Sequence, residues 1–204
     1  PQARQALARA FATKGAGREA VSGGTSALLR WFAVRKKYDL LDEGVRLARK
    51  AKAVDAVLMA DLATIVGEVG EDARAKKLLK LALALKPADK EEWLSIASAY
   101  ARVEDTARAS DALARTGPQE SWGAAPWMVL GRIEMVKKRY REAANAYGKA
   151  VDIEADECEP RFFRGLVRLL LGDPEGAEAD FRKCMDQGEK SPAVLGGLGY
   201  ALFD

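Results

Sequence analysis

Few side chains in this sequence could carry out acid–base or nucleophilic chemistry. The 204 residues include no histidine, the side chain whose charge changes nearest to neutral pH and which most often serves as a general acid or base. The sequence also contains no glycine-rich phosphate loop and no nucleophile elbow. It therefore predicts a protein that is not an enzyme, with no catalytic residue and no cofactor.

Two cysteines and one run of acids are the remaining candidates for chemistry. Cys158 and Cys184 lack the further ligands that a zinc site needs. The acids between Glu154 and Glu159 lie between two expected helices, where a solvated turn is more common than a calcium loop. We therefore predict no metal site. The sequence leaves open whether the two sulfurs come within bonding distance, but one cysteine pair is not a disulfide framework, so we expect no disulfide.

Composition and charge place the chain among ordinary globular proteins. Hydrophobic residues make up 49% and charged residues 31%, and no apolar run is long enough to predict a transmembrane segment. The net charge of +3 is uneven, since residues 1–55 carry 12 Lys and Arg against 5 Asp and Glu. Such a basic part could meet an acidic protein, anionic lipid or nucleic acid, but a solvated helix surface is the commoner explanation. Without a nucleic-acid motif or interleaved aromatic residues, we expect no nucleic acid.

The elements that would carry any site are short helices in pairs. Residues 124–157 contain two amphipathic segments separated by a basic turn, with Trp127 at place 4 and Gly131 at place 8 of this stretch. In the second segment, Ala143 and Tyr147 stand at places 20 and 24. Small residues at places 8 and 20 let two antiparallel helices cross closely, and large residues fill the space beside the crossing.

The same layout returns at intervals of 34 residues along the whole chain. Place 8 is small in five of six copies: Leu29, Ala63, Ala97, Gly131, Gly165 and Gly199. Place 24 is always large and apolar: Phe11, Val45, Leu79, Leu113, Tyr147 and Phe181. This pattern resembles the tetratricopeptide repeat, a helix-turn-helix unit that stacks into arrays.

The resemblance implies an all-α, right-handed superhelical solenoid of antiparallel helix pairs. We expect a single solenoid over residues 1–204, in which a half repeat at each end flanks four full repeats and one degenerate repeat. The half repeats are residues 1–21 and 192–204, the degenerate repeat is residues 22–55, and the full repeats are residues 56–89, 90–123, 124–157 and 158–191.

In the family, the first helices line a concave groove, and side chains at places 2, 5, 9, 12 and 13 face a bound partner. Carried onto this sequence, those places give a stripe of methionine, leucine and aromatic residues with one cation: Met128, Arg132, Met135, Phe162, Leu166, Leu169, Tyr200 and Phe203. Such a stripe suits an amphipathic or extended apolar segment of a protein that carries an acidic group. A second interpretation has equal weight, because neighbouring helices can cover a stripe at this spacing as core. The cationic clamp with which some family members bind chaperone tails is missing here.

Three arginines occupy places that normally face the paired helix. Arg161 and Arg168 stand at places 4 and 11 of their repeat, where the family rarely has arginine, and Arg164 stands at place 7. In a structural interpretation the guanidinium groups reach water or pair with nearby acids such as Glu175 and Glu178. In a functional interpretation the helix is rotated and the arginines meet an acidic partner. The structural interpretation is favoured because long charged side chains usually find water or an ion pair.

The sequence thus predicts a scaffold that binds a partner protein or peptide in its groove. An alternative from another class is a regulatory or substrate-presenting domain of a larger enzyme, such as a bacterial signalling kinase; a third is an assembly factor of the cell envelope. The last helix would direct Leu195, Leu198 and Leu202 toward a second helix that the sequence lacks. We therefore expect an excerpt of a longer array, with self-association through this exposed C-terminal helix.

Overall fold

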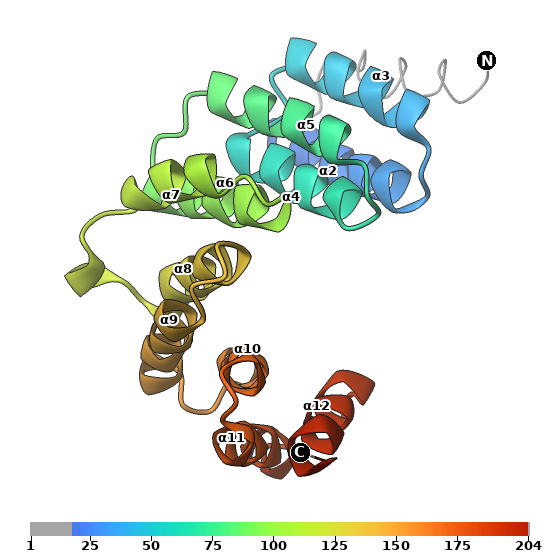
Figure 1. The fold of residues 1–204 in the computed structure, drawn as a ribbon. Helices are drawn as coiled ribbons and strands as arrows, with labels where there is room; N and C mark the ends of the chain where they lie inside the picture. The colour runs from blue at the N-terminus through green and yellow to red at the C-terminus, as the bar shows by residue number, and fades with distance from the viewer. Residues whose placement is uncertain (1–17, 204) are drawn as a thin grey trace. The chain divides into compact units, whose positions relative to one another are not determined.

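The computed structural model describes residues 18–203, and its regular elements in this range are all helical, with no strand (Figure 1). The α-helices are α2 (Arg18–Val34), α3 (Tyr38–Lys50), α4 (Ala56–Gly67), α5 (Asp72–Ala84), α6 (Lys90–Arg102), α7 (Thr106–Ala114), α8 (Ala124–Val136), α9 (Tyr140–Ile153), α10 (Cys158–Leu170), α11 (Pro174–Asp186) and α12 (Pro192–Phe203). One short 3₁₀ helix, η1 (Gln119–Ser121), lies between α7 and α8. The prediction of an all-α fold built from helix pairs is confirmed. The predicted half repeat 1–21 lies largely outside the described residues.

The period in the sequence is also the spacing of the helices. The first helices α4, α6, α8, α10 and α12 begin at residues 56, 90, 124, 158 and 192, and each step is 34 residues. The second helices α3, α5, α7, α9 and α11 begin at residues 38, 72, 106, 140 and 174, with the same step. The sequence pattern therefore fixes the start of each of these helices as well as their number.

Caps explain several of these starting points. The side chain of Asp55 accepts a hydrogen bond from the backbone N–H of Leu58 at 2.7 Å, which satisfies a free donor in the first turn of α4. Asp89 does the same for the first turn of α6. Asp173 caps α11 and is followed by proline at the first helical position, where its missing N–H is not needed.

The turn inside each helix pair contains one residue with positive φ at the same place of the repeat. Gly70 and Gly172 adopt φ values of 83° and 72° there. Lys36, Glu104 and Lys138 hold the equivalent positions with φ values of 56° to 59°. Glycine adopts this conformation without a steric penalty, whereas the other three residues pay a modest one. The turn geometry is therefore set by the helix pair and not by the local residue.

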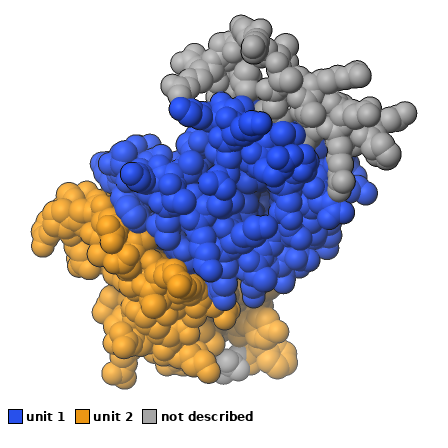
Figure 2. Space-filling view, turned by 90° about the horizontal axis from the view of Figure 1, so that it is seen from above, with its two compact units in different colours: residues 1–103 blue, residues 104–204 orange. Residues whose placement is uncertain are grey.

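The described helices belong to two compact units, residues 1–103 (unit 1) and residues 104–204 (unit 2), which Figure 2 shows in different colours. In unit 1, α4 packs against α2, α5 and α6, and α2 packs against α3. In unit 2, α8 packs against α7 and α9, while α10 packs against α9, α11 and α12. The boundary falls between α6 and α7, inside the stretch 90–123 that the sequence pattern assigns to one repeat.

The small and large places of the repeat meet at the helix crossings of unit 2. A Cβ atom built on Gly131 would lie 2.5 Å from the ring of Tyr147, and one built on Gly165 would lie 2.9 Å from the ring of Phe181. Both aromatic rings are fully buried. In these two repeats the small residue at place 8 therefore lies directly against the large residue at place 24.

The beginning of α2 differs from the expectation. The glycines and hydroxyls between Gly15 and Thr25 indicate a loose connection, but the helix already begins at Arg18 and runs through Thr25. Thr25 and Leu29 are buried in unit 1, so packing of this face outweighs the low helix propensity of the glycines. None of the described helices is long and apolar enough to cross a membrane.

Candidate functional site

The eight predicted groove residues fall into two classes of exposure. Tyr200 and Phe203 on α12 are 75% and 92% exposed, while the six residues on α8 and α10 are half-buried. Phe162, Leu166 and Leu169 pack against the buried cluster around Phe181 and Cys184. Met128 and Met135 pack against a second cluster, formed by Ala143, Tyr147 and Val167. The stripe on α8 and α10 therefore contributes to the core and presents only part of its surface.

Arg132, the single cation of the predicted groove, lies over an aromatic ring. Its guanidinium carbon is 5.7 Å from the centre of the Phe163 ring, a distance typical of a cation–π contact. Phe163 in turn stacks on Tyr147, with ring centres 5.6 Å apart. Burial raises the pKa of Tyr147 to about 12, although the nearby charge of Arg132 acts in the opposite direction. Tyr147 is therefore an uncharged packing residue at neutral pH. Arg132 already makes one contact, with the ring of Phe163.

A cavity of about 340 Å³ opens between the first turns of α10 and α12. It is lined by Cys158, Glu159, Phe162, Phe163, Glu189, Ser191, Ala193 and Val194. Its walls are mostly apolar, and its volume lies within the range of small-ligand pockets. We call it the α10–α12 cavity.

Two carboxylates, Glu159 on α10 and Glu189 in the turn before α12, line this cavity. One oxygen of Glu189 accepts a hydrogen bond from the backbone N–H of Ser191 at 3.0 Å, which holds the acid beside the opening. An apolar cavity with an acidic rim suits a large apolar side chain next to a positive charge. The cavity therefore suits a positively charged partner, whereas Arg132 suggested a negatively charged one.

Most of these lining residues are absent from the groove residues expected from the sequence. Glu159 and Ala193 both stand at place 2 of their repeats, so a systematic use of that place would have found them. Glu189 and Ser191 lie in the turn between α11 and α12. The groove pattern carries no information about this turn, so the acidic rim could be recognised only in three dimensions.

The expectation that the cysteines stay unpaired is wrong. Cys158 and Cys184 form a disulfide, with their Cα atoms 4.9 Å apart. Cys158 is the first residue of α10 and Cys184 lies near the end of α11, so the packing of the two helices brings the sulfurs together. Their places 1 and 27 in the repeat lie toward the same end of the helix pair, but this placement alone does not set the distance between the two sulfurs. Because Cys158 lines the α10–α12 cavity, the bond also fixes one wall of it.

We expect this disulfide to stabilise the protein by about 2 kcal/mol, because it restricts the unfolded chain over a separation of 26 residues. The value lies at the lower end of the usual range because measured disulfides often stabilise less than the loop entropy alone predicts. Urea unfolding with and without dithiothreitol measures the difference. The variant Cys158→Ser with Cys184→Ala should not respond to the reductant, and an unchanged midpoint in the wild type would contradict the prediction.

The arginines of α10 support the structural interpretation, with an acid that differs from the expected ones. Arg164 and Arg168 both pair with Asp180 on α11, at 2.5 Å and 2.8 Å, and not with Glu175 or Glu178. Arg161 donates to the backbone carbonyl of Ala155 at 2.7 Å. The helix is therefore not rotated to present these arginines to a partner.

The apolar face of α12 is only partly as expected. Leu195 and Leu202 are 47% and 56% exposed, whereas Leu198 packs against the cluster that contains Phe181. Self-association through this helix stays a prediction. In the part of the chain that the structure describes, no group of three or more His, Cys, Asp and Glu side chains could hold a metal ion.

Comparison with known proteins shows which solved structures share this fold. No family model matches the chain, and no curated protein matches it. Among solved structures, it is similar to a tetratricopeptide repeat protein from Parabacteroides merdae ATCC 43184, with 14% identity and a TM-score of 0.64 over 100% of this chain and 87% of that chain. It is also similar to a chain of the APC/C hetero-tetramer Cut9-Hcn1, with 16% identity and a TM-score of 0.62 over 89% of this chain and 36% of that one. MamA from Desulfovibrio magneticus RS-1 follows, with 17% identity and a TM-score of 0.56 over 80% of this chain and 95% of that chain. The chain thus spans about a third of the Cut9-Hcn1 chain.

Proposed function

Since the chain has the tetratricopeptide-repeat fold, we propose that it is a scaffold for protein interaction whose α10–α12 cavity holds an apolar side chain of a partner segment. One observation carries this proposal: an apolar cavity of about 340 Å³ lies between two consecutive first helices, and residues at groove places line it. The fold supports protein binding in general, since similar structures belong to repeat proteins that stack helix pairs.

The partner segment should carry a lysine or arginine beside its apolar anchor. Glu159 and Glu189 would face this cation at the edge of the cavity, where an ion pair adds to specificity and to the rate of association. A carboxylate at the same position would meet two like charges. This chemistry replaces the acidic group that the sequence suggested, because Arg132 is already engaged with Phe163.

Filling the cavity from within should abolish this binding. Ala193 is exposed on α12 and lines the cavity, so Ala193→Trp places an indole in the space reserved for the partner without disturbing the core. Peptides selected by phage display on the wild-type protein provide the ligands. We expect them to combine a large apolar residue with Lys or Arg, and to bind Ala193→Trp at least roughly tenfold more weakly.

Ala179→Trp is the matched control, because Ala179 is an exposed alanine on α11 that does not line the cavity. It should bind the selected peptides as the wild type does, and circular dichroism should show the same helical content for all three proteins. Peptides that bind both tryptophan variants equally well would refute the cavity as the binding site. Selection of acidic peptides would refute the proposed partner chemistry.

A further inference from the structure

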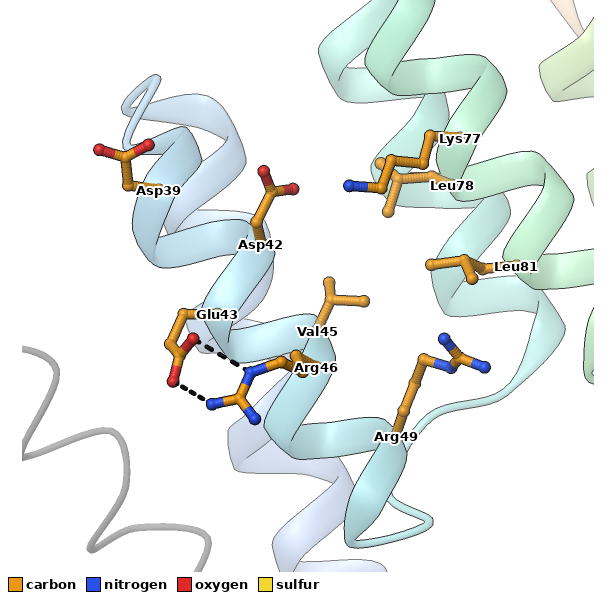
Figure 3. A pocket seen from close by; sticks show the side chains of 9 residues that line it. All are labelled: Asp39, Asp42, Glu43, Val45, Arg46, Arg49, Lys77, Leu78 and Leu81. Atoms are coloured by element: carbon orange, nitrogen blue, oxygen red, sulfur yellow. Dashed lines mark hydrogen bonds and ion pairs between the residues drawn. The ribbon is translucent and has the colours of Figure 1, made fainter.

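Unit 1 contains a second groove, which lies between two second helices, α3 and α5 (Figure 3). Its volume is about 430 Å³, and it lies outside the residues that the groove pattern of the first helices selects. Its lining combines an apolar floor, formed by Val45, Leu78 and Leu81, with acids and cations along its sides: Asp39, Asp42, Glu43, Arg46, Arg49 and Lys77. We call it the α3–α5 groove.

Packing explains why this groove is open. In unit 1, α3 packs on α2 and α5 packs on α4, so each second helix is held by its own first helix. Val45 and Leu78 are 5% and 4% exposed, and Leu81 is half-buried. The floor is therefore a fixed apolar surface, and a bound side chain would gain hydrophobic contact without a rearrangement of either helix.

Some of the charged side chains along the groove form ion pairs, and others do not. Near the start of α5, Arg74 pairs with Asp42 and lies over the ring of Tyr38 at 4.7 Å, which joins the two helices at that end. Within α3, Glu43 accepts two hydrogen bonds from Arg46, at 2.5 Å and 3.1 Å. These pairs neutralise one acid and one cation each. Asp42 and Glu43 are therefore not available to the two cations that remain.

The remaining cations are Arg49 and Lys77. Neither forms an ion pair with any acid whose side chain the structure describes, in residues 24–203. Figure 3 shows Lys77 extending from α5 toward α3, and Arg49 extending from the last turn of α3 toward α5. The two cations border the apolar floor at different places, Lys77 in the middle of α5 and Arg49 in the last turn of α3. A carboxylate bound in the groove would pair with either of them. Asp39 lies in the first turn of α3, so the two ends of α3 present opposite charges to the groove.

We propose that the α3–α5 groove is a second interaction surface, which binds an acidic protein segment with an apolar side chain next to its carboxylates. The apolar side chain would lie on Val45, Leu78 and Leu81, and the carboxylates would pair with Arg49 and with Lys77. Charge complementarity selects this occupant. Single-stranded nucleic acid fits less well, because no aromatic ring lines the groove for base stacking. An anionic membrane fits less well because it would cover Asp39 as well, whereas a peptide can bind in the groove away from that acid.

A direct test measures fluorescence polarisation of a short labelled peptide made of glutamate and leucine, with the whole chain as the binding protein. The variant Arg49→Glu with Lys77→Glu should weaken binding by roughly tenfold or more. Lys50→Glu with Lys76→Glu is the matched control. Both of these lysines are exposed on the same two helices, neither lines the groove, and the change in net charge is identical. The control should bind the peptide within about twofold of the wild type, and higher salt should weaken binding in both.

Three further arms separate the possible outcomes. Leu81→Ala should weaken binding of the leucine-containing peptide and leave binding of a peptide of glutamate and serine unchanged. This comparison separates the contribution of the apolar floor from that of charge attraction. Equal loss in both charge-reversal variants would overturn the site in favour of unspecific attraction. Binding of a single-stranded oligonucleotide or of phosphatidylserine vesicles that depends on Arg49 and Lys77, without binding of the peptide, would overturn the proposed occupant. Ala193→Trp should not change peptide binding here, so failure of this groove and failure of the α10–α12 cavity are distinguishable.

Discussion

Gly131→Leu is expected to lower the free energy of unfolding by about 3 kcal/mol, the upper end of the usual cost of overpacking. Even a Cβ atom at this position would lie 2.5 Å from the ring of Tyr147, and leucine adds three further carbon atoms. Tyr147 is 1% exposed and stacks on Phe163, so its ring cannot move aside without disturbing the contact between α9 and α10. Urea unfolding followed by circular dichroism measures the loss.

Gly148 provides the matched comparison for this variant. It lies inside α9, and a Cβ atom added there would meet nothing within 4 Å. Gly148→Ala should therefore stabilise the protein by about 0.5–1 kcal/mol through helix propensity alone. Gly131→Ala gains the same propensity but should destabilise, because the contact with Tyr147 outweighs it. If Gly131→Leu cost less than about 0.5 kcal/mol, the crossing of α8 and α9 would not depend on this glycine.

The crossing at Gly131 shows why so much of the fold could be predicted. A small residue on the first helix faces a large residue on the second, and the two lie 16 residues apart, as Gly131 and Tyr147 do (147 minus 131 is 16). The same spacing recurs in each helix pair. Helix starts follow from the same repeat, so even the variable turn residues, such as Gly172 and Lys138, do not shift them. Periodic constraints survive the loss of individual residues, and for that reason α3 in the degenerate repeat 22–55 still begins 34 residues before α5.

The candidate sites were less predictable because they depend on residues outside the repeat pattern. Glu189 reaches the α10–α12 cavity from a turn, and Arg49 and Lys77 remain as cations of the α3–α5 groove while Asp42 and Glu43 pair with other arginines. Which charged side chains pair with one another depends on their positions in three dimensions, and the sequence does not give these positions. The disulfide was predictable in part: places 1 and 27 put the cysteines at one end of the helix pair, but only the packing of α10 on α11 brings the sulfurs into contact.

The ion pairs of Asp180 have the largest expected effect on stability. The carboxylate is 3% exposed and accepts two hydrogen bonds from Arg164. Nε donates to Oδ2 at 2.9 Å and Nη2 donates to Oδ1 at 2.5 Å. Arg168 donates to the same carboxylate at 2.8 Å and to the backbone carbonyl of Gly176 at 2.9 Å. The hydrogen bond that Arg164 donates to Asp180 raises the pKa of Arg164, which means that the folded state favours the charged guanidinium. Since arginine does not lose its proton in proteins, it has no means of becoming neutral if its partner is removed.

Asp180→Ala is therefore expected to lower the free energy of unfolding by about 4 kcal/mol, because it leaves Arg164, whose side chain is 17% exposed, as an uncompensated charge between α10 and α11. Asp186→Ala on the same helix is the control; its side chain is exposed, so the change should stay within about 0.5 kcal/mol. The combination Arg164→Met with Asp180→Leu should cost much less than Asp180→Ala alone, because apolar side chains of similar length can replace a buried pair without leaving a charge behind. Urea unfolding of the four proteins measures these differences. If Asp180→Ala and the double variant lost the same amount, the cost would come from lost packing at residue 180 and not from the unpaired arginine.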